Sequence, residues 1–212
     1  MSDLIQHLDF SLRSFTAMLA VIDPLAILPV FITMTADQNE TQRRRTARLA
    51  TVYAFFLLLL FILVGNLILR LFSITIEAFQ VAGGILLLLI GLEMVHSRMS
   101  AVAHPNVKEF AEAVRAEDVA LMPLAMPMLS GPGAITTAMT IAGGNYNFVR
   151  VMIMLLVIAV VLLITYFLLL SAEKVQRRLG ANGIGLLTRF MGLLLIAYAV
   201  QMGFDGAKQL LL

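Results

Sequence analysis

The sequence predicts an all-α polytopic membrane protein with six transmembrane helices, arranged as a 3+3 inverted repeat whose first and fourth helices are broken. The prediction rests on composition, on the lengths of the apolar segments, and on a similarity between the two halves of the chain. Of the 212 residues, 60% are hydrophobic and only 13% are charged, whereas about 25% of residues in soluble domains are charged. A chain this apolar has too little polar surface to fold in water, which excludes a soluble globular protein.

Six apolar segments reach or approach the roughly 20 residues that a membrane-spanning helix needs. They cover residues 12–34, 47–69, 76–95, 119–142, 149–171 and 186–204. The polar segment 96–118 separates the third from the fourth. We therefore expect a first three-helix repeat over residues 1–95, a cytoplasmic connector over 96–118, and a second three-helix repeat over 119–212.

Lysine and arginine are distributed unequally between the two sides of this arrangement. The loops after the first, third and fifth spans, with their flanks, hold eleven of them, and the opposite side holds only Arg13, Arg70, Arg150 and Lys208. Cytoplasmic loops carry the excess of positive charge in membrane proteins. The asymmetry predicts a multi-pass protein of the bacterial inner (plasma) membrane with both termini in the periplasm.

The two halves of the chain match at an ungapped offset of 108 residues. The matching pairs are Pro24 with Pro132, Ala26 with Ala134, Arg70 with Arg178, Gly84 with Gly192, and Glu93 with its amide counterpart Gln201. Because each half has three spans, an odd number, the second half is predicted to be upside down relative to the first. Inverted repeats are typical of secondary transporters, although channels use them too, and they place binding sites near the bilayer midplane.

Both repeats contain a helix-breaking segment about halfway through their first span. In the first, Asp23 precedes Pro24, and a proline removes a backbone donor and clashes with the preceding turn. In the second, Ser130 is followed by Gly131, Pro132 and Gly133, a run that cannot sustain a regular helix. Irregular backbone at this depth survives only where protein or a wet cavity satisfies it, so the two breaks predict a midplane binding site.

The chemistry of the predicted site follows from what a broken helix exposes. Free N–H groups at the start of each second half-helix suit a carboxylate, and the carbonyls that end each first half-helix suit an ammonium group or a cation. A zwitterionic amino acid uses both. A carboxylate at the midplane costs at least about 2.5–3.5 kcal/mol, so Asp23 needs protein, water or a cation beside it. The predicted substrate-binding residues are Asp23, Pro24, Leu25, Ala26, Ser130, Gly131, Pro132, Gly133 and Gln80.

Three polar residues elsewhere in the spans have two interpretations each. Gln80 begins the apolar part of the third span, where it either faces the cavity or hydrogen-bonds within the bundle. Glu93 and Gln201 lie near the ends of the third and sixth spans. Together with Asp23 they are candidates for cation coupling or gating, and the alternative is an interfacial position.

Several short segments form a pattern across almost the whole chain. They are Asp23-Pro24-Leu25, Pro29-Val30-Phe31, 79–91, 123–127, 130–135, Arg189-Phe190-Met191-Gly192, Gln201-Met202 and Asp205-Gly206. In these segments the chain resembles the MarC family, which includes SnatA-type small neutral amino acid transporters. The resemblance implies six membrane helices, an inverted repeat, and uptake of amino acids such as glycine or alanine coupled to a cation. Ala26 departs from the glycine that the family often has there.

The leading hypothesis is therefore a secondary transporter, and the alternatives are a channel, an exporter of small polar metabolites, or a non-transporting membrane protein. An enzyme is not expected, because no histidine lies within a predicted span to serve Ser130 as a base. The chain has no cysteine, and its three histidines lack ligand spacing, so we expect no metal or cofactor beyond Na⁺ or H⁺ as a coupling ion. A net charge of only +2 excludes nucleic acid, which leaves membrane lipid and a small-molecule substrate as partners.

Overall fold

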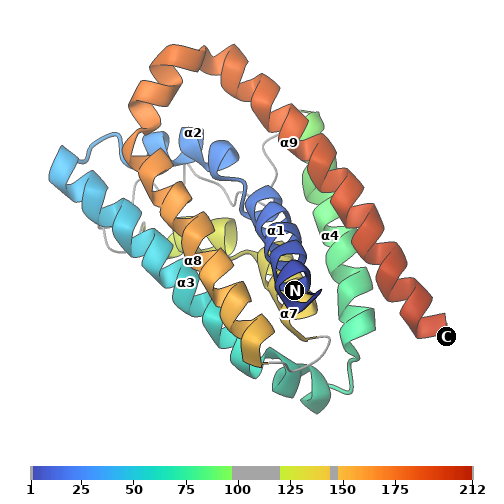
Figure 1. Cartoon of the computed structure of the whole chain (residues 1–212). Helices are drawn as coiled ribbons and strands as arrows, with labels where there is room; N and C mark the ends of the chain where they lie inside the picture. Colours follow the sequence, from blue (N-terminus) through green and yellow to red (C-terminus); the bar gives the residue numbers. More distant parts are fainter. Residues whose placement is uncertain (1, 97–119, 144–147, 212) are drawn as a thin grey trace.

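The computed structural model describes residues 2–96, 120–143 and 148–211, and all regular structure in these ranges is helical. The elements are α1 (Ser2–Ile22), α2 (Pro24–Met34), α3 (Glu40–Leu71), α4 (Ile76–Val95), η1 (Ala120–Leu129), α7 (Pro132–Gly143), α8 (Phe148–Leu170) and α9 (Ala172–Leu211). This confirms the prediction of an all-α protein (Figure 1). Apart from His96, the predicted connector 96–118 lies outside the described residues.

Five helical stretches in the described ranges are long and apolar enough to cross a membrane, so the chain is a multi-pass membrane protein. They are Ile5–Met34, Glu40–Leu71, Ile76–Val95, Phe148–Leu170 and Asn182–Leu211. Each contains or overlaps one of the predicted spans. The remaining prediction, 119–142, falls on η1 and α7, which have 10 and 12 residues and are individually shorter than the roughly 20 that a span needs.

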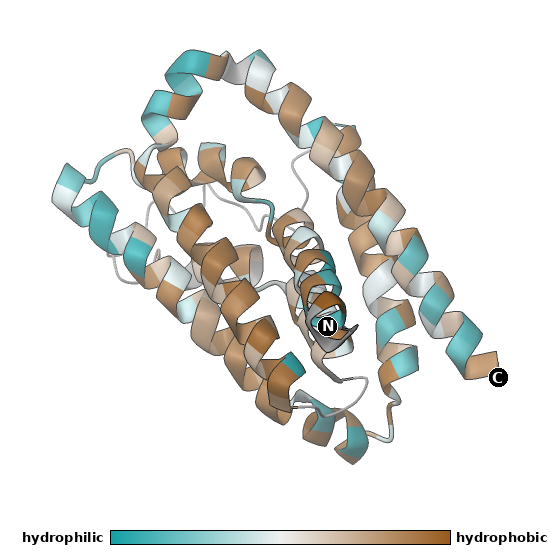
Figure 2. Ribbon diagram, viewed as in Figure 1, coloured by the Kyte–Doolittle hydropathy of each residue, from teal (hydrophilic) through white to brown (hydrophobic). Residues whose placement is uncertain are grey.

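The helices run between two ends of the molecule, which we call the basic end and the terminal end. At the basic end α2 finishes and α3 and α9 begin (Figure 1), and Arg43, Arg44 and Arg177 make ion pairs with Glu173 and Glu40 there. At the terminal end α1, α4 and α8 begin and α9 finishes; there the guanidinium of Arg150 on α8 lies 5.6 Å from the ring centre of Phe10 on α1. Hydrophobic residues dominate between these ends (Figure 2).

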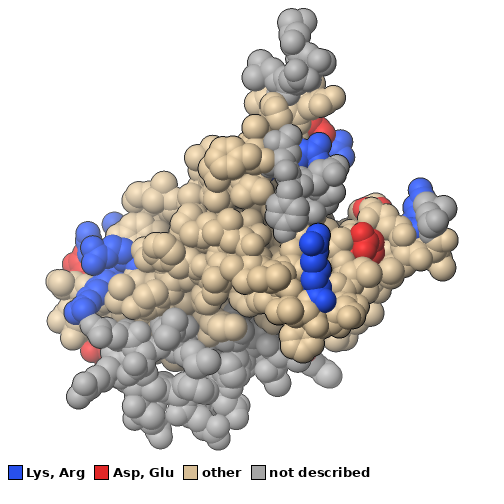
Figure 3. All heavy atoms as spheres, turned by 90° about the horizontal axis from the view of Figure 1, so that it is seen from below, with Lys and Arg blue, Asp and Glu red and all other residues tan. Residues whose placement is uncertain are grey.

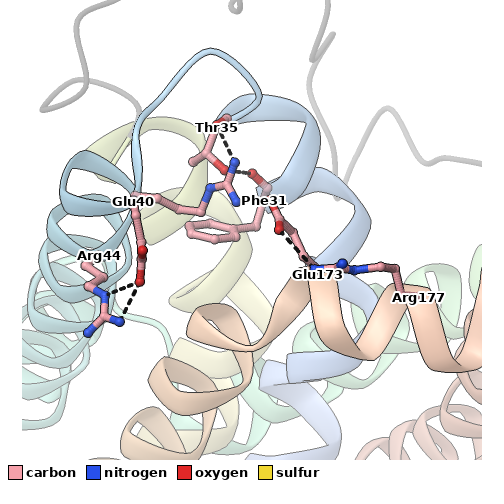
Figure 4. A network of polar contacts seen from close by, with 7 residues as sticks. Phe31, Thr35, Glu40, Arg44, Glu173 and Arg177 are labelled. Atoms are coloured by element: carbon pink, nitrogen blue, oxygen red, sulfur yellow. Dashed lines mark hydrogen bonds and ion pairs between the residues drawn. The ribbon is translucent and has the colours of Figure 1, made fainter.

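An ion pair and a hydrogen bond of one arginine connect three elements at the basic end (Figure 4). Arg43 of α3 pairs with Glu173 of α9, and its Nη2 also donates to the backbone oxygen of Thr35 at 3.2 Å. Thr35 is the residue that ends α2. Within α3, Arg44 Nη2 lies 2.6 Å from Glu40 Oε1. The side chain of Arg43 thus holds the end of α2 beside the start of α9.

The outward faces of the helices carry large apolar side chains. On α3 these include Phe56, Leu60, Leu63 and Leu67, which are 51–60% exposed. The face in Figure 3 is correspondingly mostly uncharged, with lysine and arginine in a few separate groups. Such a surface suits a hydrocarbon environment, in which helices satisfy their own backbone hydrogen bonds.

α4 and α9 form a closely packed antiparallel pair beside the rest of the bundle (Figure 1). Glycines make the close approach possible. A Cβ atom on Gly84 would lie 2.8 Å from the backbone oxygen of Ala199, and one on Gly91 would lie 2.9 Å from that of Gly192. Small residues at helix crossings are the usual means of tight packing in membranes.

Candidate functional site

The first element of the site is the junction between α1 and α2 at Asp23. This residue has φ 41° and ψ 73°, the left-handed region, because the following Pro24 disfavours a helical conformation in the residue before it and aspartate tolerates the left-handed one. Its Oδ1 accepts a hydrogen bond from the backbone N–H of Ala26 at 3.3 Å and so caps α2. Pro24 occupies the first turn of α2, where a missing N–H is harmless.

The second element is the junction between η1 and α7 at Ser130 and Gly131. η1 has π-helical geometry, with hydrogen bonds that span five residues. Both the backbone N–H and the hydroxyl of Ser130 donate to the oxygen of Ala125, at 2.9 and 2.7 Å. The oxygen of Gly131 accepts from Ile135 at 3.0 Å, and α7 begins at Pro132.

Both junctions line a single cavity with a volume of about 90 Å³. Five of the predicted substrate-binding residues line it: Asp23, Ala26, Gly131, Pro132 and Gly133. Pro24, Leu25 and Ser130 are their chain neighbours and do not line it. The other lining residues are Val21, Ile22, Ile27, Leu86, Leu87, Ile90, Met94, Met128, Ala134 and Leu195, so the wall is apolar except for Asp23 and the backbone.

Asp23 is the one charged residue among those that line the cavity. It is only 5% exposed, and its Oδ2 has no hydrogen-bond partner among the described residues. Burying an unpaired carboxylate is expensive. A charged Asp23 therefore calls for a bound cation, an ammonium group or water in the cavity.

Gly133 keeps the cavity open at the start of α7. A Cβ atom there would lie 2.4 Å from Cδ2 of Leu87 and 3.6 Å from Cγ1 of Val21. Any larger residue at this position would displace Leu87 or occupy the space beside Asp23. The glycine thus allows α7 to begin directly against the wall formed by α1 and α4.

The three other predicted residues lie away from this cavity. Gln80 is buried on α4, toward the terminal end. Glu93 is half-buried near the basic end of α4, and its Oε2 has no partner among the described residues. Gln201 is exposed on α9, where its Nε2 donates to the carboxylate of Asp205 at 2.9 Å.

The apolar wall of the site was not predicted from the sequence. Leu87 and Leu195 are each 1% exposed and both line the cavity. They are also separated by 108 residues, the offset that pairs Pro24 with Pro132. The repeat therefore contained a signal for them, but a leucine match in a leucine-rich chain carried too little weight.

No cluster of three or more histidine, cysteine, aspartate or glutamate residues that could hold a metal ion occurs in the described ranges. On the terminal side of the cavity, the hydroxyl of Thr137 on α7 donates a weak hydrogen bond to Sδ of Met202 on α9 at 4.0 Å. Thr137 is fully buried. Neither residue lines the cavity.

The chain is similar to known membrane proteins over almost its whole length. Residues 8–211 match the MarC family of integral membrane proteins. The chain is 42% identical to the UPF0056 membrane protein MJ1677 of Methanocaldococcus jannaschii, over 97% of this chain and 99% of that protein. It is 32% identical to the UPF0056 membrane protein YvbG of Bacillus subtilis, over 94% of each chain. No solved structure matches the chain.

Proposed function

This chain belongs to the MarC family of integral membrane proteins, and on that premise we propose that it is a secondary transporter of small neutral amino acids. Glycine- or alanine-like substrates are held between the two helix breaks, and transport is coupled to a Na⁺ or H⁺ gradient. The observation that carries the proposal is that both breaks line one small cavity with a single buried carboxylate.

The size of the cavity favours a small solute. Its volume is about 90 Å³, and a cavity needs only about 10–15 Å³ on this measure to hold one water. It therefore accommodates a few waters or an amino acid with little or no side chain. Drug-sized ligands occupy pockets of about 300–1,000 Å³, so the cavity does not suit them.

The polar groups of the cavity match the two charges of an amino acid. The first N–H groups of α7, at Gly133 and Ala134, lie where a helix has no internal acceptors and where its dipole favours an anion. The carboxylate of Asp23 faces the same space and suits an ammonium group or a coupling cation. The apolar remainder, with Leu87 and Leu195, leaves no partner for a charged or long polar side chain.

The packing of α4 against α9 supports the six-helix inverted repeat. Gly84 meets Ala199, and Gly192 meets Gly91; adding 108 to Gly84 and Gly91 gives Gly192 and Ala199. Such reciprocal contacts are what a two-fold axis between matching helices produces. In this arrangement η1 and α7 together form the fourth span.

The charge distribution supports an orientation with the basic end in the cytoplasm. Arg43, Arg44 and Arg177 lie at that end, and both termini lie at the opposite one. In a bacterial inner membrane the termini then face the periplasm. The family resemblance favours uptake over export.

Transport by the purified protein in liposomes tests the proposal. With an imposed inward Na⁺ or H⁺ gradient, we expect accumulation of labelled glycine or alanine, with saturation and counterflow. Flux that neither saturates nor shows counterflow would indicate a channel. An absence of flux for a full panel of neutral amino acids, with either gradient, would refute the proposal.

A further inference from the structure

The cavity extends from the helix breaks toward the basic end and is closed on the terminal side. On α4, which runs from the terminal end to the basic end, its lining residues are Leu86, Leu87, Ile90 and Met94. On α7, which runs toward the terminal end, the lining stops at Ala134 in the first turn. The closed side is therefore the one where α7 packs against α1 and α4.

Close contacts seal this side in the present conformation. A Cβ atom on Gly83 of α4 would lie 2.1 Å from Cγ2 of Thr136, and one on Gly65 of α3 would lie 2.5 Å from Cε of Met139. α7 thus rests directly on the backbones of α4 and α3. Such contacts leave no room for a solute between these helices.

Two hydroxyls on the closed side lack the hydrogen bond that other helical serines and threonines make. Serine and threonine in a helix commonly donate to the carbonyl four residues back, as Ser11, Thr51 and Thr165 do here at 2.7–3.0 Å. Oγ of Ser14 and Oγ1 of Thr140 are buried and have no hydrogen-bond partner among the described residues. Each is a buried hydroxyl without a side-chain or backbone partner among the described residues.

The antiparallel packing of α1 and α7 places these two hydroxyls at one level. A Cβ on Gly133 of α7 would lie 3.6 Å from Cγ1 of Val21 on α1. Toward the terminal end, Thr140 lies seven residues after Gly133, and Ser14 lies seven residues before Val21. That distance along a helix is about 10 Å. On α4, the buried Gln80 lies one turn beyond the contact of Gly83 with α7, at the same level, and its Cβ would lie 3.2 Å from a Cβ on Gly206 of α9.

We propose that this seam, formed by Ser14 of α1 and Thr140 of α7 with Gln80 of α4 at the same level, is the access route for small polar solutes between the terminal end and Asp23. The seam is closed here; in an alternate conformation water enters, and the hydroxyl and amide groups line the path of the amino acid and its coupling cation. An unpaired buried hydroxyl destabilises the closed seam, and hydration removes that cost. In the first half of the chain, the position that matches Thr140 at the offset of 108 residues is Ile32. The hydroxyl of Thr140 is therefore not a feature that the two halves share. The inference rests on the proposed transport function.

Cysteine accessibility tests the route without relying on transport. The chain contains no cysteine, so Ser14→Cys and Thr140→Cys each introduce a single thiol. Vesicles that expose the terminal end, identified by protease removal of an N-terminal tag, are treated with a membrane-impermeant cationic methanethiosulfonate. The control is Ala138→Cys, because Ala138 lies on the same helix and is fully buried. Unmodified thiols are counted after denaturation.

We expect the thiols at positions 14 and 140 to react about tenfold faster than the thiol at 138, since thiol modification follows access to water. Equal rates at all three positions, or modification only from the basic end, would overturn the route. Thr140→Val, which removes the hydroxyl and keeps the shape, should slow uptake from the terminal side with unchanged substrate affinity, and Thr140→Ser should restore it. Unchanged uptake in the valine variant would also count against the route.

The two proposals fail in different ways. Rapid modification at positions 14 and 140 without any amino acid flux would reject the transport function and support a hydrated seam. Coupled flux with thiols that react no faster than the one at 138 would support transport and reject the seam. Thermal unfolding of each variant shows whether the substitution has altered the fold.

Discussion

Asp23 combines a left-handed backbone conformation with a buried carboxylate, and each of its two oxygens has a separate role. Oδ1 caps α2 through Ala26, whereas Oδ2 is buried without a partner among the described residues. The cap is an ordinary structural interaction that asparagine can reproduce. The buried and unpaired Oδ2 is therefore the oxygen for which we expect a positively charged partner, either a cation or an ammonium group.

We predict that Asp23→Asn abolishes cation-coupled uptake but preserves the fold. Asparagine keeps the capping oxygen and tolerates positive φ, but it removes the negative charge that a cation or ammonium group would neutralise. Liposome uptake under an ion gradient measures the first effect and thermal unfolding the second. Asp205→Asn is the matched control, because Asp205 is exposed and bonded to Gln201. Retention of full coupled uptake in Asp23→Asn would remove this residue from the mechanism.

At the residue scale, the helix junctions could be predicted from the sequence because they contain proline. The residues of the cavity wall could not be predicted. Asp23 beside Pro24, and Gly131 beside Pro132, are local signals that need no knowledge of the fold. Whether Leu87 faces lipid or the cavity depends on the rotation of α4 against α7, and a leucine suits both surroundings. For the same reason, the position of Gln80 outside the cavity required the structure.

At the scale of elements, the contact between α4 and α9 depends on main-chain proximity. A Cβ on Gly84 would lie 2.8 Å from the oxygen of Ala199 and 2.9 Å from the nitrogen of Gly203. Backbone atoms cannot rotate away as a flexible side chain can. The two helices must therefore separate to accommodate any side chain at Gly84.

Gly84→Ala should consequently destabilise the protein by about 1–3 kcal/mol, the usual cost of overpacking. Gly185→Ala on α9 is the contrasting variant, because nothing lies within 4 Å of a Cβ at that position. An alanine in an open helical position is expected to stabilise by about 0.5–1 kcal/mol. The melting temperatures of the two variants test this. We expect that of Gly84→Ala to lie below the wild-type value and that of Gly185→Ala to lie at or above it. The reverse order would contradict the close crossing.

The start of α9 is anchored by a charge pair that should respond to pH. The hydrogen bond and charge of Arg43 lower the pKa of Glu173 below its usual value of 4.5. Because the folded state then binds fewer protons than the unfolded chain, the pair stabilises above about pH 4.5 and its contribution disappears as the pH falls through the lowered pKa. We expect Glu173→Gln to lower the melting temperature at pH 7 and to have no effect in strong acid. Glu40→Gln, which alters a pair within one helix, should change it less at pH 7.

The positions of the membrane-spanning segments were easier to predict than the points at which a segment divides into two helices. Hydropathy alone located the second, third and fifth spans, because a membrane-spanning helix must be apolar over its whole length. It also marked the region of η1 and α7, but not the π-helical hydrogen bonding that ends at Ser130. That geometry depends on how Ala125 meets Ser130 in three dimensions, which periodicity does not specify.

At the scale of the whole molecule, the proposed repeat and the charge distribution have opposite consequences for insertion. The reciprocal glycine contacts of α4 and α9 are what the proposed two-fold relation between the halves predicts, whereas the charge distribution makes the two ends of the molecule unlike. A symmetric pair of repeats could insert in either direction. The excess of arginine and lysine at the basic end is the feature that selects one of them.

This gives a prediction for the intact protein in a bacterial membrane. Alkaline phosphatase, which is active only after export, should be active when fused after Leu211 or to the N-terminus, and inactive when fused after Asn39 at the basic end. A cytoplasmic fluorescent reporter at the same positions should give the opposite pattern. Replacing Arg43, Arg44, Arg45 and Arg48 by glutamine should weaken the preference and yield a mixed population, because these residues supply much of the asymmetry. An active phosphatase after Asn39 in the wild-type chain would reverse the orientation and place the proposed access route on the cytoplasmic side.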